Sequence, residues 1–232
     1  MSLNPFAADP GIPARLARLS PAARAQVADI AMDAAGRRQD ALPANMGGVL
    51  LAETAADLCA RFGIESVQDL MRILVEPARR LARPPISGFH VGAVGLEKAT
   101  GNLILGGNVE FPGTHLGLTV HGEGFVATRA FSRGNALEAI AIGEAHPCAH
   151  CRQYLSEFEN GRDLRLIDPL GHDLSLGDLY PWPFDPGYLG ETGAAAGRRG
   201  FPDLGAEAPA VMPIRSTLSN HSRLRSSAPS IR

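Results

Sequence analysis

T-V-H-G-E-G (119–124) and H-P-C-A-H-C-R-Q-Y (146–154) are the two segments that decide the fold of this chain. They contain an H-x-E motif, His121 and Glu123, followed by a P-C-x-x-C motif, Cys148 and Cys151. Zinc prefers nitrogen and thiolate ligands, and a catalytic zinc site keeps three protein ligands so that water can take the fourth position. We therefore predict a Zn2+ site with His121, Cys148 and Cys151 as ligands and Glu123 as the proton carrier.

Each half of this pattern has simpler explanations when taken alone. An H-x-E triplet arises easily by chance, and C-x-x-C can be a redox pair or half of a structural zinc site. The redox interpretation leaves His121 without a role, and a structural site of four cysteines is one ligand short because only Cys59 remains. The two motifs in this order favour the catalytic site, and we interpret Cys59 as a small residue of the core.

The region before the cysteines indicates how they are held. Pro147 suits the start of a helix, so Cys148 and Cys151 would lie one turn apart at a helix N-terminus, which favours thiolates. Residues 121–133 also have a helical pattern. We expect the metal where the N-termini of these two helices meet.

Composition narrows the class of protein. The chain has 232 residues, a net charge of −2 and a pI near 6.4, so it lacks the basic character of a nucleic-acid-binding domain. Three cysteines do not make a disulfide framework, and no apolar run is long enough to span a membrane. We expect a cytoplasmic protein with a small-molecule substrate and neither nucleic acid nor membrane as partner.

Patterning predicts an α/β protein with a mixed β-sheet flanked by helices. Residues 1–83 read as an N-terminal helical region, and residues 84–190 as the zinc-dependent core. Strands are expected at 91–96, 103–109, 137–142, 164–167 and 173–176, with helices at 121–133 and 148–158 between them. Residues 191–232, rich in Gly, Ala, Ser, Pro and Arg, read as a disordered tail.

Several segments resemble the long bacterial-type cytidine deaminases: P-I-S-G-F-H-V-G-A (85–93), G-G-N-V-E-F (106–111), the two zinc motifs and Y-P-W-P-F-D-P (180–186). The resemblance implies a cytidine-deaminase-like three-layer fold, a bound Zn2+, a nucleoside substrate and a homodimer. It also implies that Asn108 and Glu110 bind ribose hydroxyls, that Phe89 packs on the base, and that Phe184 closes the pocket across the dimer interface.

The residue types agree in part with these roles. An amide and a carboxylate two positions apart lie on the same face of a strand end and suit a sugar diol, although an ordinary polar strand end is the simpler interpretation of N-x-E alone. For Phe89 and Phe184, packing into the core is as good an interpretation as base stacking.

The expected reaction is hydrolytic deamination of cytidine and deoxycytidine to uridine and deoxyuridine, with release of ammonia after attack by a zinc-activated hydroxide. This would make the protein a hydrolase of pyrimidine salvage that acts on the C–N bond of a cyclic amidine. Two alternatives are a base deaminase acting on RNA or DNA, and a catalytically impaired deaminase-like module for binding or dimerisation.

The chain departs from the family pattern at three places. Gly122 and Gly124 surround the acid, and Asp185 replaces a glycine next to Phe184. The second, catalytically degenerate deaminase-like domain of long relatives is largely missing, because only residues 191–232 would remain for it.

Overall fold

The computed structural model of this chain describes residues 6–36 and 48–184. The predictions for Asp185 and for the tail at 191–232 lie outside these residues. The described residues belong to one compact unit.

The centre of the described unit is a six-stranded mixed sheet with the order β1-β3-β2-β4-β5-β6. Neighbouring strands are antiparallel except β4 and β5, which run parallel with Ala139 opposite Arg165. A parallel pair needs a crossover connection, and the helix α6 supplies it. The strands are β1 (Val49–Leu50), β2 (Gly92–Glu97), β3 (Leu103–Gly107), β4 (Leu137–Ile142), β5 (Arg165–Ile167) and β6 (Asp173–Ser175).

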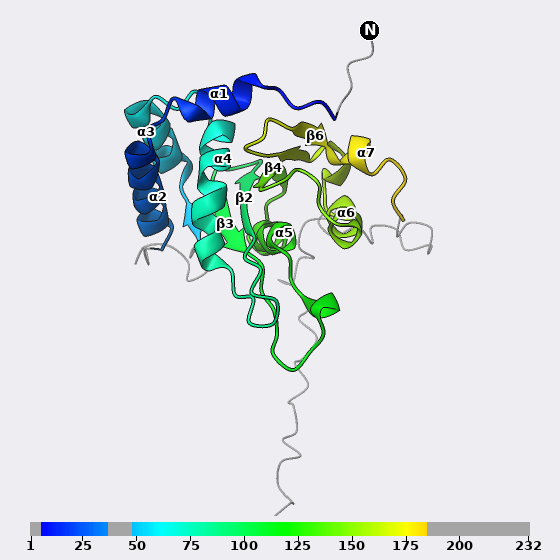
Figure 1. The fold of residues 1–232 in the computed structure, drawn as a ribbon. Coiled ribbons are helices and arrows are strands. Elements are labelled where there is room, and N and C mark those ends of the chain that lie inside the picture. The colour runs from blue at the N-terminus through cyan, green and yellow to red at the C-terminus, as the bar shows by residue number, and fades with distance from the viewer. Residues whose placement is uncertain (1–5, 37–47, 185–232) are drawn as a thin grey trace, which may run out of the picture. The chain divides into compact units, whose positions relative to one another are not determined.

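One face of the sheet is covered by helices from the N-terminal part of the chain. Because side chains alternate along a strand, Val94, Leu96 and Leu105 all point to this face, where they share a core with the helices α2, α3 and α4. Figure 1 shows these helices, in blue and cyan, beside the strands. The helices before β2 are α1 (Gly11–Ala17), α2 (Pro21–Gly36), α3 (Ala52–Phe62), α4 (Val67–Ala78) and the 3-10 turn η1 (Arg79–Leu81).

The opposite face is covered by α5 (Gly122–Ser132) and α6 (Ala149–Ser156). Ala93, Ile104 and Ile140 point to this side, and they pack with Val126 of α5 and Leu155 of α6. Helix, sheet and helix form three layers, which confirms the predicted α/β fold. The remaining elements are the 3-10 turns η2 (Leu116–Leu118) and η3 (Gly161–Asp163) and the helix α7 (Leu176–Leu179).

The N-terminal region differs from the expectation of helices alone. Val49 and Leu50 form the edge strand β1, which pairs with Ile104 and Leu103 of β3. Two residues are too few to show a strand period, so tertiary pairing rather than local sequence decides their conformation. A separate helical region at 1–83 stays a prediction, although α2–α4 pack directly on the sheet.

Candidate metal centre

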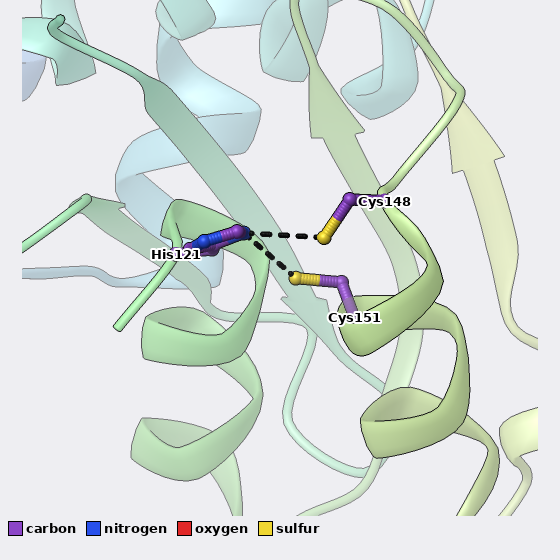
Figure 2. Close-up of side chains that lie close together, drawn as sticks. All are labelled: His121, Cys148 and Cys151. Atoms are coloured by element: carbon purple, nitrogen blue, oxygen red, sulfur yellow. Dashed lines mark hydrogen bonds between the residues drawn. The ribbon is translucent and has the colours of Figure 1, made fainter. Parts of the chain in front are cut away.

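Three side chains from two helix N-termini meet at one point of the structure. The Nδ1 atom of His121 lies 3.4 Å from the Sγ atom of Cys148 and 3.3 Å from the Sγ atom of Cys151. Figure 2 shows all three side chains pointing toward one another between α5 and α6. Their ligand atoms all lie within 4.8 Å of one another, so the three residues are positioned to hold a metal ion.

The backbone of both helices explains this arrangement. His121 is the N-cap residue of α5 and Cys148 is the N-cap residue of α6, both with extended backbone, while Cys151 lies in the first turn of α6. The free N–H groups and the dipole at a helix N-terminus favour negative charge, and thiolate is the form that binds metal. The expected meeting of two helix N-termini is therefore confirmed.

The donor set fits zinc in both type and spacing. For a tetrahedral ion with ordinary zinc bond lengths, a nitrogen and a sulfur ligand are ~3.6 Å apart. The two nitrogen-to-sulfur distances, 3.3 and 3.4 Å, are close to this value. One neutral imidazole and two thiolates also balance the charge of a divalent ion, so Zn2+ suits the site.

Glu123 lies beside the ligands in the first turn of α5 and is only 6% exposed. Burial raises the pKa of the Cys151 thiol far above its ordinary value, and the neighbouring Glu123 and Cys148 raise it further by charge and hydrogen bonding. Glu123 is therefore in direct reach of the metal-binding sulfur. A cation reverses this effect on the thiol, because it stabilises thiolate more strongly than burial opposes it.

Three side chains of α6 lie next to the ligand residues. The Arg152 Nε atom donates to the carbonyl oxygen of Pro147 at 2.7 Å, which holds the turn that presents Cys148. The His150 ring lies 6.0 Å from the His121 ring and stacks on Tyr154. The Tyr154 hydroxyl shares a 2.7 Å hydrogen bond with Thr128 of α5, so the two helices are joined beside the cluster.

The predicted ribose-binding residues hold the loop that contains Phe89. The Asn108 side chain accepts from the Val91 N–H at 2.8 Å and donates to the Phe89 carbonyl at 2.9 Å. The Glu110 carboxylate accepts from the N–H groups of Ile86 and Ser87 at 2.8 and 2.9 Å. It also accepts from the Ser87 hydroxyl at 2.5 Å. Sequence reasoning did not foresee this scaffold, because its partners are 17 to 24 positions apart.

These hydrogen bonds lower the pKa of Glu110. Burial alone would raise the pKa of this carboxyl, but the hydrogen bonds from Ser87 and Ile86, with the nearby His90, outweigh burial and hold it below its usual range. Glu110 is consequently an anion at neutral pH. An anionic acceptor suits a hydroxyl donor.

The two aromatic residues are both at the surface of the described chain. The Phe89 side chain is 68% exposed and Phe184 is 50% exposed, so neither belongs to the core. The backbone of Phe184 is fixed to α6, since its N–H and C=O groups both bond to the Gln153 amide, at 2.9 and 2.8 Å. Their roles at a base stay predictions.

Cys59 lies apart from the cluster as a half-buried residue of α3. It packs against the core beneath α2–α4, and its thiol donates to the Ser66 carbonyl at 3.7 Å. In the described part of the chain, no helix has the length and apolar character needed to cross a membrane.

One histidine and two cysteines at two helix N-termini, with the acid of H-x-E beside them, are the arrangement of the zinc-dependent deaminases. Residues 64–163 match the family described as the cytidine and deoxycytidylate deaminase zinc-binding region. The matched segment contains His121, Cys148 and Cys151, so this part of the chain is similar to that family.

The chain is also similar in sequence to proteins named cytidine deaminase. The chain is 34% identical over 151 residues to a cytidine deaminase of Shewanella pealeana, a match that covers 65% of this chain and 50% of the relative. It is 38% identical over 139 residues to a cytidine deaminase of Cronobacter sakazakii, covering 60% and 46%. The chain thus spans about half the length of these curated relatives. The crystal structure of cytidine deaminase from Mycobacterium tuberculosis has 34% identity and a TM-score of 0.44, and covers 50% of this chain and 96% of that one.

Proposed function

We propose that this protein deaminates cytidine and deoxycytidine hydrolytically, giving uridine or deoxyuridine and ammonia. The observation that carries the proposal is the convergence of His121, Cys148 and Cys151 with the buried acid Glu123 beside them. Relatives over this region are named cytidine deaminases.

A zinc ion bound by the three ligands would supply a Lewis acid that activates water at neutral pH. Glu123 has the position and the chemistry for the proton steps. Its carboxylate takes a proton from the attacking water and gives it to N3 of the pyrimidine ring. It then takes the proton of the new hydroxyl group on C4 and gives it to the amine, so that ammonia leaves and the carboxylate is free again. Because Glu123 is 6% exposed, bulk water has little access to these transfers.

The loop held by Asn108 and Glu110 supports the proposed sugar site. A carboxylate offers about four acceptor positions, and three at Glu110 are used by Ile86 and Ser87. One position on Oε1 remains for a ribose hydroxyl. The Asn108 amide has a second N–H beyond the one given to Phe89, so the pair can still provide one acceptor and one donor. Phe89 would then pack on the base.

We also propose that the protein acts as a homodimer in the cytoplasm. Large apolar side chains are exposed on the two segments around the proposed sugar site: Ile86, Phe89, Phe111, Leu116 and Leu118. Exposed apolar groups of this kind are typical of an interface, and Phe184 of the partner would close the pocket. Thiolate zinc ligands also require a compartment that keeps cysteines reduced.

The test of the function is Glu123→Gln in the zinc-loaded protein. The variant keeps the size of the side chain but cannot carry the proton, so we expect kcat for cytidine to fall by about 10²- to 10⁴-fold with zinc content unchanged. Loss of the cytosine absorbance measures the rate. Glu138→Gln, on an exposed position of β4, is the matched control and should keep the rate. A wild-type rate in Glu123→Gln, or wild-type protein inactive on cytidine and deoxycytidine, would contradict the proposal.

The sugar site has a separate test. Glu110→Gln keeps the loop contacts that the amide oxygen can accept but removes the charge, and we expect a higher KM for cytidine with zinc content unchanged. Assaying free cytosine beside cytidine isolates the contribution of the sugar. An equal KM for cytidine in variant and wild type would remove Glu110 from the site.

A further inference from the structure

A buried carboxylate outside the motifs contacts the loop that carries the first cysteine ligand. Asp168 follows β5, is 0% exposed, and lies next in space to residues 143–147, which join β4 to Cys148. We refer to residues 143–147 as the ligand loop. Asp168 Oδ2 accepts a hydrogen bond from the buried Ala145 N–H of this loop at 3.1 Å.

The other contacts of Asp168 fix its orientation. Its Oδ1 atom accepts from the N–H groups of Leu170 and His172, at 3.0 and 2.8 Å. Its Oδ2 atom lies 2.7 Å from Nδ1 of His172. Since a carboxylate only accepts, the His172 proton must be on Nδ1. Each oxygen of the Asp168 carboxylate therefore has two N–H donors, which favours this orientation of the side chain.

A second contact holds the same loop. The His172 ring packs edge-on against the His146 ring, with centroids 5.1 Å apart and an interplanar angle of 74°. His146 directly precedes Pro147 and Cys148. Two successive residues of the ligand loop are therefore held: Ala145 by a hydrogen bond to Asp168, and His146 by ring contact with His172.

The backbone carbonyl of Asp168 is bound by an arginine of α4, in the helical layer on the opposite face of the sheet. Arg72 of α4, 5% exposed, donates through Nε to the Asp168 carbonyl oxygen at 3.0 Å. Its second nitrogen pairs with the buried Asp69 at 3.0 Å, and Asp69 also binds Arg15 of α1. The buried Asp69 carboxylate is thus paired with two arginines, so its burial is not opposed by an unpaired charge.

We infer that Asp168 is a positioning residue for the metal centre. With His172 and Arg72 it sets the conformation of the ligand loop, and through the loop the place of Cys148 relative to His121 and Cys151. A carboxylate that contacted only the sheet would affect stability alone. Asp168 instead bonds to Ala145, three residues before the ligand Cys148. Groups around metal ligands commonly tune metal affinity in this way. The inference rests on the proposed zinc site.

The experiment compares Asp168→Asn with wild type in zinc affinity, measured by chelator competition at fixed pH, and in the cobalt-substituted spectrum. The amide oxygen cannot accept from four donors, and its NH2 group faces N–H groups. We expect the zinc dissociation constant to rise about 10- to 100-fold, with a changed sulfur-to-cobalt absorption band.

Glu97→Gln is the matched control, because Glu97 is also a 0% exposed carboxylate, but it pairs with Arg133 and binds the β2–β3 turn, away from the ligand loop. It should lower the melting temperature and leave zinc affinity and the cobalt spectrum unchanged. Asp168→Asn that behaves like this control would overturn the inference.

Two changes at His172 keep the test decisive if Asp168→Asn does not fold. His172→Asn retains an N–H near the position of Nδ1, and should keep more zinc affinity than His172→Phe, which retains a ring but no donor. Equal, wild-type affinity in both overturns the inference. Wild-type protein that does not bind zinc refutes the proposed function itself, which is a different result.

Discussion

Removal of the charged group of Arg133, in Arg133→Met, is expected to destabilise the protein strongly. Arg133 follows α5 and is 9% exposed, and its guanidinium binds the fully buried Glu97 of β2 through Nε at 2.5 Å and through a second nitrogen at 3.2 Å. In Arg133→Met, Glu97 keeps the hydrogen bonds from Thr100 at 2.5 Å and Asn102 at 3.2 Å. The substitution therefore removes the arginine that binds this buried carboxylate through two nitrogens, and leaves the more weakly coupled charge of Arg129.

The magnitude follows from that burial. Breaking a buried ion pair by removing one partner costs about 3–5 kcal/mol. For a protein of this size, 1 kcal/mol corresponds to about 2–4 °C in Tm, so we expect a loss of about 6–20 °C. Thermal unfolding at pH 7, followed by circular dichroism, measures it.

The pH dependence gives an independent check of the cause. Burial alone would raise the pKa of Glu97, but its bonds to Arg133, Thr100 and Asn102 outweigh burial and hold the pKa below the ordinary value. A depressed acid stabilises the fold above its unfolded pKa, about 4.3, and loses this contribution as the pH falls through the folded pKa. Without Arg133, burial is less opposed, so Glu97 protonates at a higher pH. The difference between variant and wild type should shrink as the pH falls from 7 toward 4.

A double substitution separates charge from packing. Glu97→Gln combined with Arg133→Met removes both charges, and we expect it to recover most of the stability lost by Arg133→Met alone. A Tm loss below about 2 °C in the single variant, or a loss that does not depend on pH, would refute the reasoning.

Three further predictions concern the metal and the sheet. Cys148→Ala should abolish stoichiometric zinc binding, whereas Cys59→Ala should retain it; zinc per chain after dialysis distinguishes them. Burial raises the pKa of the Cys151 thiol, so zinc must displace the thiol proton when it binds. Zinc affinity should therefore increase with pH, and binding should release protons. Calorimetry in buffers of different ionisation enthalpy measures this proton release. Gly92→Ala places a Cβ against the backbone oxygen of Val75 in α4, so it should lower the free energy of unfolding by about 1–3 kcal/mol. Gly36→Ala, which has open space, should leave it unchanged; urea unfolding measures both.

Some ends of helices and strands have causes that the local sequence shows. Gly63 ends α3 in the left-handed region, with φ of 65°, and the Ser66 hydroxyl caps α4 by accepting from the Asp69 N–H at 3.1 Å. The turn between β2 and β3 has Gly101 at φ of 71°. Each of these signals lies within four residues of its effect, so no tertiary information was needed.

The contacts around the site could not be predicted in the same way. Asp168 bonds to Ala145, 23 positions earlier, and Glu110 bonds to Ile86, 24 positions earlier. In the sequence Asp168 begins D-P-L-G and is typical of a turn. A carboxylate in a turn near a ligand loop has no motif of its own, and only the strand order shows which loop it faces.

The strand order also explains why the ligands meet at all. Helix α5 leads directly into the start of β4 and runs in the opposite direction to it. The N-terminus of α5, with His121, therefore lies near the C-terminal end of β4. Helix α6 begins after β4 at that end, with Cys148 at its first position. Strand β5 runs parallel to β4, so Asp168 comes out at the same end. In α/β sheets, sites form outside the carboxyl ends of neighbouring parallel strands. Because β4 and β5 are parallel, the two cysteine ligands that follow β4 and the Asp168 carboxylate that follows β5 lie at the same end of the sheet. His121 reaches the cysteines because α5 runs antiparallel to β4.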